Sequence, residues 1–167
     1  PSVPADVQIR LLDVLGARRA MVAWTPALNL TQDANDRLAK AAIKALGSMV
    51  DTNRMPELVA LFAAASDKRV ADFARALVVA MAEDTSFDVA VKAADGVTGN
   101  RRKVWHQVLH KVTGDKALAV LVTDTRNEDA AVRLSAVKTL AQWGNAAQAK
   151  PVLKKISTES TDPEVRA

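Results

Sequence analysis

Two histidines, His106 and His110, are the residues of this sequence best suited to chemistry. They stand four residues apart, so a helix would project both imidazoles from one face, the spacing with which helices present two metal ligands. A zinc site needs at least three protein ligands, and no third candidate is evident. Lys103 and Lys111 on the same side would repel a dication. The sequence therefore predicts no metal site here.

The same histidines could also serve as general bases. That role would require an orienting carboxylate and a substrate pocket, and the sequence indicates neither. The chain has no cysteine, which excludes disulfides, thiolate metal sites and cysteine nucleophiles. We therefore expect no catalytic site, no cofactor and no enzymatic activity.

Cations gather around these histidines. The segment 100–116 accounts for the whole formal net charge of +4. Its cations are Arg101, Arg102, Lys103, Lys111 and Lys116, opposed by Asp115. Clustered Lys and Arg exchange counterions for phosphates, so one interpretation is an anion or nucleic-acid surface. The other is a solvated helix face, which the small net charge and the lack of interleaved aromatic residues favour.

The elements that must position these residues form an internal repeat. The pattern Asp-x-x-Val begins at Asp67, Asp129 and Asp162, and each Asp is expected to cap a helix. Looser copies begin elsewhere, and the apolar anchors of all copies are Val7, Leu38, Val70, Val104, Val132 and Val165. Their spacing of roughly thirty residues fits a helix, a turn, a second helix and a loop.

Partner helices fill the gaps between the anchors. They are expected at 20–30, 55–65, 86–95, 115–122 and 146–156. A pair this short cannot bury its own apolar face, so its stability must come from stacking on neighbouring pairs. No apolar run approaches the roughly 18 residues that a membrane-spanning helix needs. With 49% hydrophobic residues, the chain is expected to form one all-α domain over 1–167, without a membrane span.

The D-x-x-V-R pattern, opening an Ala-rich helix that ends in Leu-Gly, resembles bacterial HEAT-like repeats, the group that includes the phycobilisome-lyase repeats. The resemblance covers nearly the whole chain. It is clearest at 129–144 and departs most at Val104, where Arg101 replaces the Asp. It implies an α-α superhelix (a solenoid) of about five helical hairpins, with the second helix of each pair on the concave side. It also implies binding or scaffolding rather than catalysis.

Both ends of the chain cut through a repeat, so we expect a fragment of a longer protein.

Positions two and six residues after each anchor are predicted to line the groove. They are Ile9, Asp13, Lys40, Lys44, Asp72, Ala76, His106, His110, Leu134 and Lys138. Together with the basic segment they give a candidate binding surface of Lys40, Lys44, Arg101, Arg102, Lys103, His106, His110, Lys111 and Lys138.

The function predicted from this surface is a non-catalytic protein-interaction or scaffold module. Its partner would be a protein or peptide, such as another domain of the parent chain. The alternative is a nucleic-acid-binding domain that uses segment 101–116, similar to DNA glycosylases built from HEAT-like repeats.

Overall fold

The computed structural model describes residues 3–82 and 84–159. Within these ranges the secondary structure is helical, with no strand, which confirms the all-α prediction. The chain divides into two compact units, Pro1–Gly96 and Val97–Ala167. The expectation of a single repeat domain over 1–167 stays a prediction. None of the helices in the described ranges is long and apolar enough to cross a membrane.

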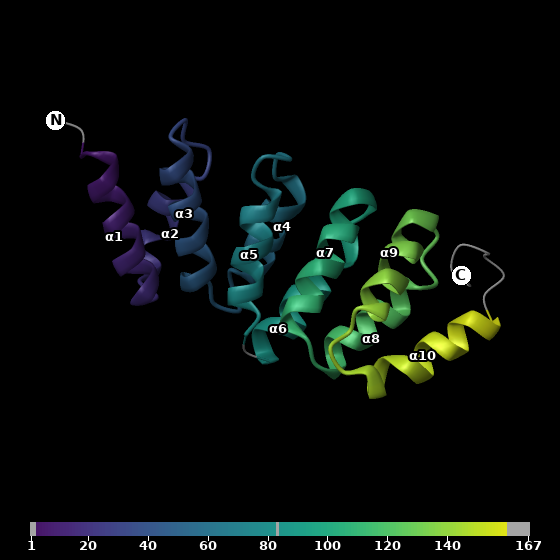
Figure 1. Cartoon of the computed structure of the whole chain (residues 1–167). Coiled ribbons are helices and arrows are strands. Elements are labelled where there is room, and N and C mark those ends of the chain that lie inside the picture. Colours follow the sequence, from purple (N-terminus) through teal and green to yellow (C-terminus); the bar gives the residue numbers. More distant parts are fainter. Residues whose placement is uncertain (1–2, 83, 160–167) are drawn as a thin grey trace. The chain divides into compact units, whose positions relative to one another are not determined.

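The first unit is a row of parallel helices with shorter helices packed beside it. Its elements are α1 (Ala5–Ala17), η1 (Met21–Ala23), α2 (Trp24–Leu30), α3 (Asp36–Met49), α4 (Met55–Ala64), α5 (Val70–Ala80), α6 (Asp84–Ala93) and η2 (Ala94–Gly96). α1, α3 and α5 lie side by side in that order (Figure 1). α2 packs on α3, and α4 packs on both α5 and α6.

The second unit contains the basic segment. Its elements are α7 (Gly99–Val112), α8 (Asp115–Asp124), α9 (Ala130–Ala141) and α10 (Ala146–Glu159). α9 contacts α7, α8 and α10, and α7 also packs on α8 (Figure 1). The predicted partner helices therefore form close to their expected positions.

Side-chain caps begin two of the repeat helices. Asp129 accepts hydrogen bonds from the backbone N–H groups of Ala131 and Val132, which confirms its predicted capping role. Asn35 caps α3 in the same way, although the repeat pattern had not marked it. The prediction for Asp67 is wrong, because Asp67 itself lies in a turn over 67–69 and Arg69 is the cap residue of α5. Asp162 lies outside the described residues.

Equivalent positions in neighbouring parallel helices are separated by a similar number of residues in the sequence. Asp13 in α1 pairs with Lys44 in α3 across a sequence separation of 31 residues, which we call the repeat period. The starts of α1 and α3 are also 31 residues apart, as are those of α7 and α9, whereas α5 begins at Val70, 34 residues after the start of α3. These intervals are close to the predicted spacing of roughly thirty residues, and the repeat itself stays a prediction.

A correspondence between α3 and α7 corrects the register of α7. Both helices are 14 residues long and begin at 36 and 99, so each position of α3 has an equivalent in α7. The buried residues Ala42, Ile43, Ala45 and Leu46 of α3 correspond to Trp105, His106, Val108 and Leu109 of α7, which are also buried. The anchor Leu38 then corresponds to Arg101, three residues before the predicted anchor Val104. The prediction of Val104 as the anchor assumes an apolar residue, but the anchor position of α7 holds Arg101, so the predicted groove positions in α7 lie three residues too late.

Glycines set the distance between the parallel helices of the first unit. A Cβ atom on Gly16 of α1 would lie 3.2 Å from the Cα atom of Ala45 in α3. A Cβ atom on Gly47 of α3 would lie only 2.7 Å from the Cα and carbonyl O atoms of Ala76 in α5. The helices approach this closely because neither glycine carries a side chain.

Candidate functional site

A groove of about 610 Å³ runs between α7 and α9 in the second unit. Its lining combines cations, neutral polar groups and apolar groups, and contains no acidic residue. The lining residues are Asn100, Lys103, Val104, Gln107, Ala131, Leu134, Ser135, Lys138, Thr139 and Gln142. This volume lies within the range that protein binding sites usually offer to ligands.

The corrected register explains which α7 residues reach this groove. In the first unit, Lys40 and Lys44 of α3 line the groove between α3 and α5. The corresponding α7 residues are Lys103 and Gln107, and both line the α7–α9 groove. Two residues predicted from the α9 anchor, Leu134 and Lys138, lie on the opposite wall.

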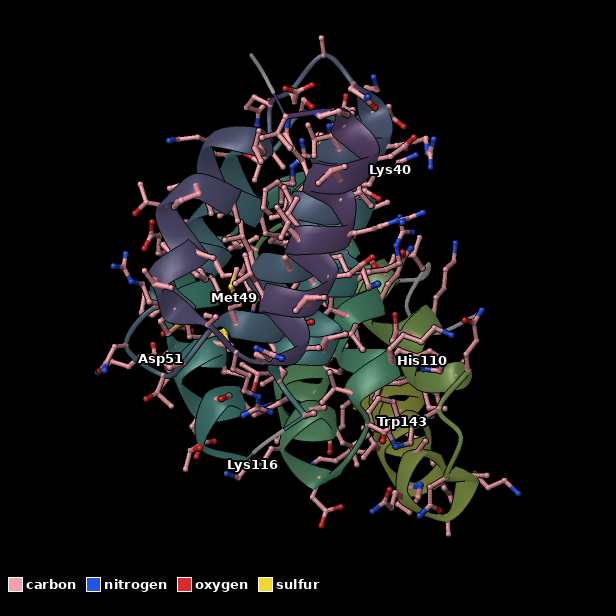
Figure 2. The ribbon with its side chains drawn as sticks, turned by 90° about the vertical axis from the view of Figure 1, so that its left-hand side faces the viewer. Lys40, Met49, Asp51, His110, Lys116 and Trp143 are labelled. Atoms are coloured by element: carbon pink, nitrogen blue, oxygen red, sulfur yellow. The ribbon has the colours of Figure 1, made fainter. Side chains whose placement is uncertain are left out.

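The two histidines do not form the exposed surface that the sequence predicted. His106 has no solvent-exposed surface, so its predicted place in the groove is wrong. His110 is partly buried, and its ring meets Trp143 edge-on with 6.1 Å between ring centroids (Figure 2). The reason for both is the three-residue register error, which counted core positions of α7 as groove positions.

The predicted cations also separate into different environments. Lys111 is exposed, Arg101 is partly buried, and the side chain of Arg102 is only 11% exposed. Lys40 and Lys44 belong to the first unit, and both are ion-paired there. Lys40 Nζ lies 2.7 Å from Asp36 Oδ2, and Lys44 Nζ lies 2.8 Å from Asp13 Oδ1. The residues of the predicted binding surface therefore do not form one continuous surface within either unit.

Arg102 and His106 instead hold a buried carboxylate, Asp124, at the end of α8. Arg102 Nε donates to Asp124 Oδ2 at 2.7 Å, and Arg102 Nη2 donates to Oδ1 at 3.0 Å, the two-pronged geometry of strong guanidinium–carboxylate pairs. His106 Nε2 lies 2.9 Å from the same Oδ2 atom. His106 Nδ1 lies 3.0 Å from Ser135 Oγ in α9. One network thus connects α7, α8 and α9 beneath the groove.

Each polar group of this network can find a partner. A carboxylate only accepts hydrogen bonds, so His106 Nε2 carries the proton that is donated to Asp124. In the neutral ring, Nδ1 then accepts the Ser135 hydroxyl proton. In the charged ring, Nδ1 donates to Ser135 Oγ instead. Ser135 is the member of the network that lines the groove.

Burial and the neighbouring cationic groups shift the pKa of Asp124 in opposite directions. Burial alone would raise the pKa of Asp124, because it disfavours the charged carboxylate. The hydrogen bonds and positive charge supplied by His106 and Arg102 outweigh burial, so the pKa of Asp124 is lowered below its ordinary value. Asp124 is therefore an ionised acceptor at neutral pH.

Sequence reasoning did not find Asp124 or Ser135. The α3 residues that correspond to Arg102 and His106 are Ala39 and Ile43, both buried and apolar. Two polar residues at core positions of the repeat require an internal partner, because unpaired buried charges are costly. Polar residues at the core positions of α7 therefore indicate a buried partner, but these positions are recognised as core only after α7 is aligned correctly with α3.

The contacts run in the order serine, histidine, aspartate, as they do in serine hydrolases. A fluorophosphonate probe is nevertheless expected to leave Ser135 unmodified. Ser135 lies inside α9, where the backbone N–H groups are used within the helix, so they cannot bind a developing oxyanion. Intact-mass measurement checks this result. Labelling that disappears in both Ser135→Ala and His106→Ala variants would contradict it.

Among the described residues, no group of three His, Cys, Asp or Glu side chains is arranged to hold a metal ion. Both ring nitrogens of His106 already have protein partners. The arrangement can thus present a basic groove, lined by polar and apolar side chains, above the buried ionic network of Arg102, His106 and Asp124. A scan against protein-family models and a search among curated proteins found no match to this chain.

Proposed function

We propose that this chain is a non-catalytic protein-interaction module built from HEAT-like repeats, and that its principal binding site is the groove between α7 and α9. The observation that carries the proposal is the lining of this groove, where Lys103 and Lys138 face a shared space without an acidic residue. The equal interval of helix starts from α1 to α3 in the first unit and from α7 to α9 in the second supports the repeat assignment. In this proposal the repeats continue as an α-α superhelix, and α7 and α9 belong to its concave side.

The groove favours an acidic partner. Lys103 and Lys138 both line the groove, one on α7 and one on α9, and can present their charges to a ligand there. Val104 and Leu134 add apolar surface, and Gln107 offers an amide. We infer that the partner is a peptide segment carrying Glu or Asp beside apolar residues, which would bury the apolar surface and pair with both lysines.

The groove between α3 and α5 fits this role less well. Its volume is about 330 Å³. Its lining includes Asp72, whose carboxylate pairs with Arg75, while Lys40 and Lys44 pair with other acids of the unit. The charges of this groove are therefore largely satisfied inside the protein, and a charged ligand would have to displace existing ion pairs.

Nucleic acid binding is the second candidate. The basic segment 100–116 suggested it, but Arg102 is committed to Asp124 and His106 is buried. Fewer cations of the segment are then available to phosphates than its composition indicates. Two lysines in a groove provide few positive charges for binding a phosphate backbone. This small number favours an acidic peptide as the partner.

Fluorescence anisotropy with a labelled peptide rich in Glu and Leu tests the proposal. The double variant Lys103→Glu, Lys138→Glu is expected to bind this peptide about tenfold more weakly, because two favourable charge contacts become repulsive. The matched control is Lys150→Glu, Lys154→Glu, which makes the same charge change on exposed positions of α10. The control should leave the affinity nearly unchanged.

Two further ligands separate the alternatives. A peptide with Lys in place of each Glu should not bind. A mixed-sequence DNA duplex, measured at about 50 mM and about 200 mM salt, would show a steep loss of affinity if phosphates were the natural ligand. Equal weakening of the acidic peptide by both double variants would contradict the assignment of this groove, and tight salt-sensitive duplex binding would favour the nucleic-acid alternative.

A further inference from the structure

An apolar stripe is exposed along α1. Val7, Leu11 and Val14 are 46%, 51% and 50% exposed, and their spacing of four and three residues places them on one face of the helix. α1 stands at the end of the row formed by α1, α3 and α5 (Figure 1). Large apolar side chains aligned in this way are unusual on a surface that stays in water.

The repeat shows what covers this face elsewhere in the same unit. The equivalent positions one repeat period later are Leu38, Ala42 and Ala45, and those two periods later are Arg69, Phe73 and Ala76. All six are buried. Ala45 faces Gly16 of the preceding helix α1, and Ala76 faces Gly47 of the preceding helix α3. The stripe on α1 is thus the face that each later helix of the row uses to receive its predecessor.

Two ion pairs between α1 and α3 join residues that are one repeat period apart. Asp6 in α1 lies 3.4 Å from Arg37 and Asp13 lies 2.8 Å from Lys44, and each partner in α3 stands one repeat period later. Two pairs with one offset show that the helices run parallel. The Asp6 side chain is still 73% exposed and that of Asp13 48% exposed, which leaves room for a second cation on each. An incoming helix would gain most by presenting cations to these two carboxylates.

We propose that the stripe of Val7, Leu11 and Val14 is a docking site for another helical pair of the same repeat. One helix of this pair lies parallel to α1, with a Gly or Ala against Val14 and cations facing Asp6 and Asp13. This inference does not depend on the function proposed for the α7–α9 groove. It defines a second surface, whose partner is recognised by helix packing rather than by acidic charge.

A second copy of the chain fits this face less well. An antiparallel pair of α1 helices centred between Arg10 and Leu11 would bring Asp6 of one copy within about one helical turn of Asp13 of the other, and like charges repel. The β-branched Val7 and Val14 would also meet each other, without the glycine that lets the helices of this row approach closely. Both features favour a repeat helix over α1 itself.

α3 carries the features that the proposed partner needs. Gly47 occupies the position of Gly16, while Arg37 and Lys44 occupy the positions of Asp6 and Asp13. A copy of residues 33–62 fused ahead of Pro1 of the full chain would place a second α3 helix one repeat period before α1. In the fused protein we expect one cooperative thermal transition, with a Tm raised by roughly 5 °C because the stripe becomes buried.

Two matched variants make the outcome specific. Leu11→Glu should hardly change the Tm of the unfused chain, where Leu11 is half-exposed, but should abolish the gain in the fused chain. Gly47→Leu placed only in the appended copy should also abolish the gain. An unchanged Tm, or a separate early transition of the added helices, would overturn the proposal. So would an unfused chain that sediments as a dimer and becomes monomeric with Leu11→Glu, since a second copy would then occupy the face.

Discussion

Replacing Asp124 with alanine is expected to lower the free energy of unfolding by about 3–5 kcal/mol, the range found when one partner of a buried ionic network is removed. Asp124 is 3% exposed and accepts hydrogen bonds from both Arg102 and His106. Without it, the largely buried guanidinium loses its counter-ion, and His106 Nε2 loses its acceptor. Urea denaturation followed by circular dichroism measures the change.

The exposed carboxylate of Glu128 supplies the control. Glu128→Ala removes an acid close to the same helix end, yet should change the free energy of unfolding by no more than about 0.5 kcal/mol. Equal effects of Glu128→Ala and Asp124→Ala would mean that the network does not hold α7, α8 and α9 together.

The contribution of Asp124 should depend on pH with a definite sign. Burial opposes ionisation, but His106 and Arg102 outweigh it, so the folded-state pKa of Asp124 lies below the ordinary value of 3.8. A lowered folded pKa means that the stabilisation is fully present above pH 3.8 and is lost as the pH falls through the folded pKa. The difference in stability between the wild type and Asp124→Asn should therefore be constant from neutral pH to about 5, and should shrink in more acidic solution.

The prediction of helices succeeded where apolar residues marked the repeat. Val132 and Leu38 identified α9 and α3, because an aliphatic anchor, a cap and a terminal glycine or loop agree on one register. The same reasoning placed Lys40 and Lys44 on an exposed face of α3, where the structure has them. Local periodicity suffices for such helices, since their buried side is apolar along its whole length.

The prediction of the site failed in α7 for a physical reason. A periodicity search assumes that core positions are apolar, but Arg102 and His106 occupy core positions because Asp124 neutralises them. Asp124 belongs to another helix, and Ser135 to a third. Only the tertiary packing of three helices brings the four residues together, and a single amino-acid sequence gives no measure of such long-range pairing.

Gly47 gives the second large expected effect. Gly47→Ala should lower the free energy of unfolding by about 1–3 kcal/mol, the usual cost of forcing an extra carbon into a packed contact. The added Cβ would lie 2.7 Å from backbone atoms of Ala76 and 2.8 Å from its Cβ, and backbone cannot rotate away. α3 and α5 would have to separate. Alanine normally stabilises a helix by about 1 kcal/mol over glycine. A lower free energy of unfolding in Gly47→Ala would therefore have to come from the steric clash with Ala76.

Two other glycines form a graded control series for this contact. At Gly16 the nearest atom would be 3.2 Å from the new Cβ, so Gly16→Ala should lie near neutral, because the helix preference offsets a small adjustment of α1. At Gly144 nothing lies within 4 Å, and Gly144→Ala should stay within about 0.5 kcal/mol of the wild type. If the three variants were equally stable, helix propensity alone would explain the glycines. The close approach at Gly47 would then not define the spacing between the helices. The docking geometry proposed for α1 is based on the same contact, so it would lose its support.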